Sequence, residues 1–207
     1  MSSANLVRWS GLAALIGGLL FIILDILESL LFGNQAYTEA AGTSAWIIVQ
    51  GFYIVAAVLI TLGLVGLYVR QVVQVGTLGL VAFVVAFFGG MMIAGATWSE
   101  TFFGAWLAEA APQLLDAEPA GALAAGLLIT YLLFAIGWFL FGFASLRAGV
   151  LPRAGTLLLI IGTVLFPVLG VLAIPFAGVL FGAAVAWMGY ALWSGAGDAA
   201  LIAEGVT

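Results

Sequence analysis

The chain contains no lysine, no histidine and no cysteine, and its only basic residues are four arginines. Without cysteine there is no disulfide, no thiolate nucleophile and no sulfur ligand for a metal. Without histidine there is no imidazole base, no imidazole ligand for zinc or haem and no histidine switch near neutral pH. We therefore expect no metal centre and no cofactor. So few basic side chains also exclude a nucleic-acid-binding surface.

Charge of either sign is scarce. Only 6% of the 207 residues are charged, whereas 66% are hydrophobic. A soluble domain has roughly a quarter charged residues, because its surface must face water. Thirteen charges cannot cover a soluble domain of this size, so the sequence predicts that the lipid bilayer surrounds most of the protein.

The sequence has no enzyme motif of the common kinds. It lacks a G-x-S-x-G elbow, an H-E-x-x-H zinc motif and a P-loop. No catalytic residue is predicted from it, and an enzyme is the less favoured class.

Six segments are long and apolar enough to span a bilayer, which takes about 20 residues. They run over residues 9–32, 45–69, 76–97, 121–146, 155–173 and 176–194, with a short loop expected over 70–74. The apolar run from 11 to 33 is about twice the length of a signal-peptide core, so it is expected to be a retained helix. The sequence thus predicts an all-α integral membrane protein, a six-transmembrane-helix bundle in which residues 1–207 form a single transmembrane domain.

The longest connection is expected to be an outer interfacial segment over residues 99–118. Apolar side chains recur there at helical spacing, and Pro112 is expected to end or kink the segment. The interpretations are an interfacial connector or a lid over a site.

The arginines indicate an orientation. Arg8, Arg70, Arg147 and Arg153 all fall on one side of a six-helix arrangement. Loops rich in arginine face the cytoplasm, so both termini are predicted to be cytoplasmic.

The openings of two helices are alike, with Gly-Thr-Leu at 76–78 and again at 155–157. This similarity favours three helical hairpins in parallel orientation, as in transporters with internal repeats. The alternative is that every helix entering from the same side prefers a small residue there.

Contacts between small residues are expected to hold the helices together, because burying leucine gains little free energy when the surrounding lipid tails are equally apolar. Gly178, Gly182 and Ala186 form a stripe at a spacing of four. This stripe is predicted to contact the fifth helix, across a tight turn at Pro175. The alternative partner is another subunit, in a homo-oligomer or with a different membrane protein.

Asp25 and Glu28 are the most unusual residues, because both lie within the first hydrophobic run. Their spacing of three places them on one helix face. A carboxylate in a bilayer costs roughly 2.5–3.5 kcal/mol at the centre and less near the edge, so such groups are functional hypotheses by default. The alternative is structural: Glu28 reaches the headgroups, and Asp25 makes one hydrogen bond to a neighbouring helix.

Other polar side chains lie at a similar depth, and no arginine is near them in the sequence. Gln50 and Tyr53 on the second segment are expected to support the two acids, and Glu100 is a weaker candidate. Two acids without a basic partner are neutralised either by protons or by a cation held by oxygen ligands. Trp46, Trp98 and Tyr53 offer faces for a cation–π contact with an organic cation.

Two fragments resemble stretches of known sequences. Arg8-Trp9-Ser10-Gly11-Leu12 and the run from Leu146 to Arg153 are similar to segments of small bacterial and archaeal membrane proteins of uncharacterised function. The resemblance implies a polytopic membrane protein in a prokaryotic inner membrane. It carries over no functional residue.

Three functions fit these features. The preferred hypothesis is a small membrane transporter or channel-like protein with an outward-facing acidic site for a cation or proton, formed by Asp25, Glu28, Gln50, Tyr53 and Glu100. The alternative is a structural or accessory membrane subunit without a substrate. The second alternative is a lipid hydrolase that uses carboxylates alone.

Overall fold

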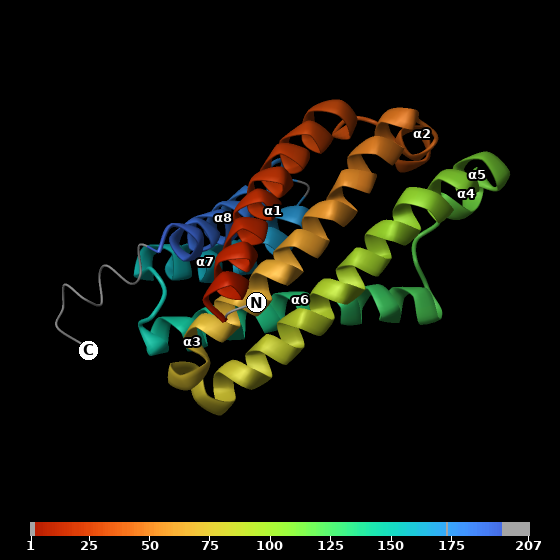
Figure 1. Ribbon diagram of the computed structural model, residues 1–207. Coiled ribbons are helices and arrows are strands. Elements are labelled where there is room, and N and C mark those ends of the chain that lie inside the picture. The colour runs from red at the N-terminus through yellow and green to blue at the C-terminus, as the bar shows by residue number, and fades with distance from the viewer. Residues whose placement is uncertain (1–2, 173, 196–207) are drawn as a thin grey trace.

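The computed structural model describes residues 3–172 and 174–195, and all regular structure within them is helical (Figure 1). The long helices are α1 (Ser3–Phe32), α3 (Ser44–Trp98), α6 (Gly121–Ala148), α7 (Arg153–Val171) and α8 (Val179–Ser194). The short ones are α2 (Tyr37–Ala41), the π-helix η1 (Ser99–Gly104), α4 (Ala105–Ala110) and α5 (Pro112–Leu115). The prediction of an all-α protein is confirmed.

Three helical stretches are long and apolar enough to cross a membrane: Asn5–Phe32, Ser44–Ala110 and Gly121–Ala148. Their outer faces carry large apolar side chains, with Leu30 69% and Leu123 62% exposed. A continuous apolar surface of this kind is unfavourable in water and is matched by lipid. The chain is therefore a membrane protein. The helix α8 is shorter, at about 24 Å, than the hydrocarbon core of about 30 Å.

The helix α3 folds back on itself at Gly76, so that residues 44–75 and 77–98 form two arms side by side (Figure 1). Tyr68 and Phe83 stack between the arms with ring centroids 4.4 Å apart. The prediction of a loop over residues 70–74 is wrong, because this stretch is helical. Gln71 is fully buried there, and its Nε2 donates to the Ser145 hydroxyl of α6 over 2.6 Å. The Ser145 hydroxyl thus satisfies the amide donor of a buried polar side chain, whereas the Gln71 Oε1 has no hydrogen-bond partner among the described residues.

Alanine at Gly76 is expected to destabilise the protein by about 1–3 kcal/mol. Gly76 has φ +57° and ψ −155°, a conformation that residues with a Cβ rarely adopt, and no atom lies within 4 Å of its Cβ position. The effect therefore comes from the backbone alone. A matched control is Gly95→Ala, which also meets no atom within 4 Å but lies in regular helix. Unfolding in mixed detergent–SDS micelles measures both, and equal stability of the two variants would contradict this interpretation of the turn.

The segment predicted to be a separate interfacial connector prolongs the second arm of α3 instead. The π-helix η1 and the helix α4 continue directly from it, so the helical path ends only at Ala110 (Figure 1). Pro112 then starts α5, and the chain crosses to α6. The connector touches α2, where the Thr38 hydroxyl donates to Asp116 over 3.3 Å. This continuation was not predictable, because aromatic and acidic residues suit an interface equally well.

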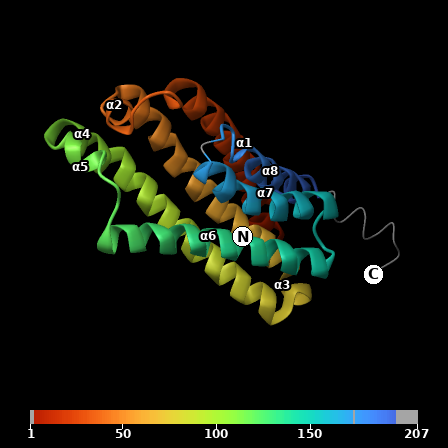
Figure 2. The same ribbon diagram turned by 180° about the vertical axis from the view of Figure 1, so that it is seen from behind.

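The bundle is closed by contacts between the first and last helices (Figure 2). The helix α1 packs on α3 and α8, α3 packs on α6, and α7 lies between α6 and α8. The most buried large side chains are Trp138, Phe141, Phe181 and Leu64, which fill the middle. The connection after α7 is longer than the tight turn predicted at Pro175, because α8 starts only at Val179. Residue 173 lies outside the described residues.

The small-residue stripe of α8 packs against α1, which corrects the prediction of a contact with the fifth helix. A Cβ on Gly18 would lie 2.5 Å from the carbonyl oxygen of Gly182 and 2.6 Å from the amide nitrogen of Ala186. A Cβ on Gly178 would likewise lie against the side chains of Phe21 and Asp25 of α1. The stripe is therefore covered within the chain, and a partner subunit would need another surface.

Candidate functional site

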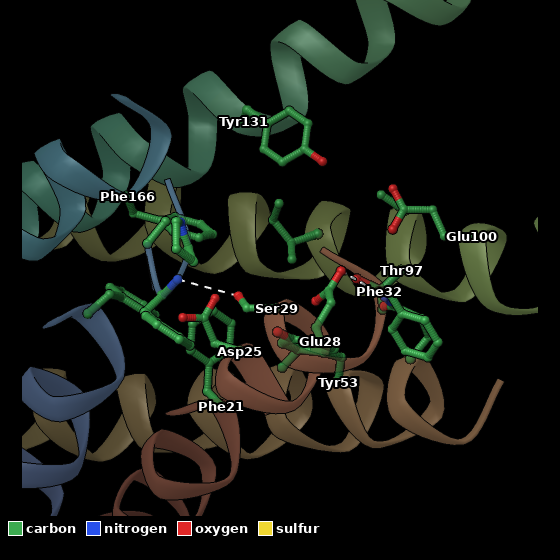
Figure 3. A pocket seen from close by; sticks show the side chains of 18 of the residues that line it. Phe21, Asp25, Glu28, Ser29, Phe32, Tyr53, Thr97, Glu100, Tyr131 and Phe166 are labelled. Carbon is green, nitrogen blue, oxygen red and sulfur yellow. Dashed lines mark hydrogen bonds between the residues drawn. The ribbon is translucent and has the colours of Figure 1, made fainter. Parts of the chain in front are cut away.

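A cavity of about 770 Å³ is lined by residues from the half of the bundle that lies away from Gly76. Figure 3 shows it from close by. It is partly open to the outside of the protein, and both arms of α3 contribute to it together with α1, α2, α6, α7 and the connection to α8. Helices that are far apart in the sequence thus form one space. Its volume falls in the range of roughly 300–1,000 Å³ that is usual for small-molecule sites.

Asp25 and Ser29 fasten the α7–α8 connection to α1. The Gly178 amide donates to Asp25 Oδ2 over 3.2 Å. The Phe176 amide donates to Ser29 Oγ over 3.4 Å (Figure 3). Gly178 immediately precedes α8, so the Asp25 carboxyl also lies at the positive end of that helix dipole. This is the structural role considered for Asp25, and it operates at the edge of the cavity.

Glu28 is held by two side chains from the first arm of α3. Gln50 Nε2 donates to Glu28 Oε1 over 3.4 Å, and the Tyr53 hydroxyl makes a second hydrogen bond with the same carboxyl. Gln50 is buried, so its amide is fixed by its surroundings. Glu28 therefore lines the cavity in a set orientation.

Glu100 faces the same space from η1, which continues the second arm of α3, together with Tyr131 of α6 (Figure 3). In the same turn the Thr101 hydroxyl donates to the Thr97 carbonyl over 2.6 Å. Short π-helical turns inside longer helices occur frequently at functional sites. Glu100 interacts electrostatically with Glu28, so the two carboxyl groups come from different helices to one region.

Tyr37 covers this region from α2, outside the candidate membrane spans. Burial raises the pKa of its hydroxyl to about 12, and the charges of Glu100 and Glu28 act in the same direction. The Tyr37 hydroxyl therefore stays protonated at neutral pH and remains a hydrogen-bond donor. It contributes a polar group to the cavity without adding a negative charge.

No arginine lines the cavity within the described part of the chain. The helix ends that carry the four arginines lie at the opposite end of the bundle (Figure 1). Three acids without a basic neighbour in the lining make the cavity electronegative. A proton or a cation from solution is the remaining means of neutralising it.

Aromatic rings form much of the remaining wall. Phe21 of α1 lies at the centre of this group, with centroid distances of 5.5 Å to Tyr53, 6.0 Å to Phe166 and 5.8 Å to Phe181. Trp138 packs on Phe181 and is buried in the interior of the bundle. The phenylalanines were not among the predicted site residues, because phenylalanine within an apolar helix gives no signal that separates a cavity wall from a lipid-facing surface.

Two tryptophans of the lining have unsatisfied donors. The indole N–H groups of Trp46 and Trp138 are buried and have no hydrogen-bond partner among the described residues. A buried donor without a partner costs about 1–3 kcal/mol. The walls of the cavity thus contain hydrogen-bond donors without a partner as well as acids without a basic neighbour.

The five predicted site residues gather around this one cavity. They come from α1, from the start of α3 and from η1 beyond its end, which lie apart in the linear sequence. That they bind a cation stays a prediction. Trp98 does not belong to the lining and is 55% exposed, so the cation–π face expected there is absent from the cavity.

The acids do not form a conventional metal site. Within the described residues, no group of three or more Asp, Glu, His or Cys side chains is arranged to hold a metal ion.

Fold and site together define an all-helical membrane protein with an acidic, aromatic cavity at one end of its bundle. Comparison with known proteins gave no match, whether with protein-family models, with curated protein sequences or with solved structures. The resemblance of the two arginine-containing fragments to prokaryotic membrane proteins stays a prediction.

Proposed function

We propose that this chain is a small membrane transport protein that binds a cation or protons in the acidic cavity. The observation that carries the proposal is the convergence of Glu28 and Glu100, from different helices, on a partly open cavity that no arginine of the described residues lines. Such charges are costly in a membrane protein and are retained where they face a pathway or a site. The alternative of an accessory subunit relied on an uncovered stripe of small residues, and α1 covers that stripe within the chain.

The placement in the membrane is part of the proposal. If each arm of α3 spans the membrane separately, these two arms and the helices α1, α6, α7 and α8 make six spans. The six spans would form three helical hairpins. The arginine-bearing end would then face the cytoplasm of a prokaryotic cell, with both termini on that side and the cavity on the outer side. The short α7 and α8 would require local thinning of the bilayer.

The cavity offers a simple exchange mechanism. A carboxyl group that loses its bound proton can take a cation in its place, so the site alternates between two neutral states. Gln50 and Tyr53 hold Glu28 in one orientation for both states. The α7–α8 connection, fastened to α1 by Asp25 and Ser29, borders the same site.

Cation-dependent proton movement tests this function. Proteoliposomes with purified protein and an internal pH dye receive gradients of sodium, potassium, calcium, tetramethylammonium or tetraphenylphosphonium. We expect at least one gradient to move protons faster than in protein-free vesicles. Glu28→Gln and Glu100→Gln are expected to abolish this movement, because a neutral amide cannot exchange a proton for a cation.

The matched control is Glu109→Gln, the same substitution at an exposed acid of α4 outside the lining. It is expected to behave as the wild-type protein. If no gradient moves protons or its own cation beyond the level of protein-free vesicles, the transport proposal fails, and co-purification of a partner subunit becomes the next experiment.

A further inference from the structure

The size of the cavity argues against a bare metal ion as its main ligand. A space of about 770 Å³ is far larger than a dehydrated sodium or calcium ion needs, and it suits an organic molecule. The described residues also lack a group of three acids arranged for a metal. Hard divalent ions take six or more oxygen ligands at short distances, and two carboxyl groups supply at most four of them.

The charge of the cavity defines the sign of the ligand. Asp25 accepts from the Gly178 amide at the start of α8, whereas Glu28 and Glu100 come from different helices to one region of the cavity and set the charge there. Glu28 approaches from α1 and Glu100 from η1, so a positive group between them interacts with both (Figure 3). A negative ligand would meet two carboxyl groups and no arginine of the described lining.

The walls define the body of the ligand. Phe21 forms edge-to-face pairs with Tyr53, Phe166 and Phe181 beside the acids. Aromatic rings attract organic cations through their electron-rich faces and bury the apolar parts of such ions at the same time. Metal ions keep their water and gain little from such walls.

We propose that the ligand of this cavity is a lipophilic organic cation, of the ammonium or phosphonium class, held between Glu28 and Glu100 against the aromatic cluster around Phe21. This inference rests on the proposed function, because it names the substrate class of the same site. The shared chemistry is a delocalised or alkylated positive charge on an apolar body. A free solute and a choline lipid headgroup both carry it.

Binding of tetraphenylphosphonium to the full-length purified chain in a maltoside detergent tests the inference. Two of the seven tryptophans, Trp46 and Trp138, line the cavity, so intrinsic fluorescence includes a signal from the site. Tetraphenylborate has the same shape and the opposite charge, so it controls for partition into apolar surface. We expect tetraphenylphosphonium to bind saturably and tetraphenylborate to show no saturable binding. Glu28→Gln and Glu100→Gln are each expected to weaken it at least tenfold, or about 1.4 kcal/mol, whereas Glu109→Gln leaves it unchanged.

A separate arm identifies the source of the cation. Displacement of tetraphenylphosphonium by a phosphocholine detergent, but not by a maltoside of equal chain length, assigns the site to a lipid headgroup. Persistence of binding in that detergent assigns it to a free solute. Either result supports an organic cation, because displacement by the choline headgroup is itself competition by the same chemistry.

Two outcomes overturn the inference and are distinct from failure of the transport proposal. Equal binding of both tetraphenyl ions, or binding that is the same in Glu28→Gln and wild type, shows apolar partition only. Saturable, Glu28-dependent binding of sodium, potassium or calcium without tetraphenylphosphonium binding refutes the organic cation and leaves cation transport standing. If no cation binds and the vesicles show no flux, both proposals fail.

Discussion

Alanine in place of Gly18 is expected to lower the free energy of unfolding by about 3 kcal/mol, because it forces α1 away from α8. The added Cβ would lie 2.5 Å from the Gly182 carbonyl oxygen and 2.6 Å from the Ala186 amide nitrogen. Both are backbone atoms of a regular helix, so no side-chain rotation relieves the clash. Close backbone approach is the main attraction between helices in lipid, and this substitution removes it.

The matched control for Gly18 is Gly51→Ala, in the first arm of α3. No atom lies within 4 Å of the Cβ position of Gly51, and alanine is the better helix former by about 1 kcal/mol. Gly51→Ala is therefore expected to be neutral or slightly stabilising. Unfolding by SDS in maltoside micelles, followed by tryptophan fluorescence, measures both. A Gly18 variant as stable as the wild type would mean that α1 and α8 do not pack this closely.

Removal of the Phe181 ring is expected to destabilise the protein by about 2 kcal/mol or more. Phe181 is 1% exposed and contacts Phe21, Phe134, Trp138 and Phe166, with centroid distances from 5.2 to 6.5 Å. In lipid the transfer of an apolar side chain contributes little, so the expected loss comes from the packing contacts and the void that alanine leaves.

The same substitution at Phe52 is the control, because this side chain is 51% exposed on the outer surface. Phe52→Ala is expected to change stability by less than about 0.5 kcal/mol. The difference between the two variants isolates the contribution of the aromatic cluster. Equal effects at both positions would show that Phe181 is not part of a packed interior.

The aromatic cluster connects stability with the candidate site. Phe21 and Phe181 belong to the packed middle of the bundle and also form the wall of the cavity. A ligand seated against them would add contacts to the folded state only, and would raise its stability in proportion to the logarithm of ligand concentration. Loss of Phe181 should therefore weaken ligand binding as well as the fold.

The class of protein and the helix content were predictable from composition and local spacing. So few charges cannot cover a soluble protein, and unbroken apolar runs must satisfy their backbone hydrogen bonds within a helix when lipid is the solvent. Asp25 and Glu28 were recognisable for a related reason, because an acid is conspicuous among apolar residues in a membrane segment. None of these conclusions requires knowledge of which helices are neighbours.

Which side chains meet was settled by three-dimensional packing. The approach of Glu100 to Glu28 depends on the fold-back of α3 at Gly76, and the contact of α8 with α1 depends on closure of the whole bundle. Neither is encoded in local spacing, because small residues permit many helix contacts with similar energy. Likewise, a phenylalanine facing lipid and one lining a cavity are equivalent in the sequence, and the packing of the helices alone separates them.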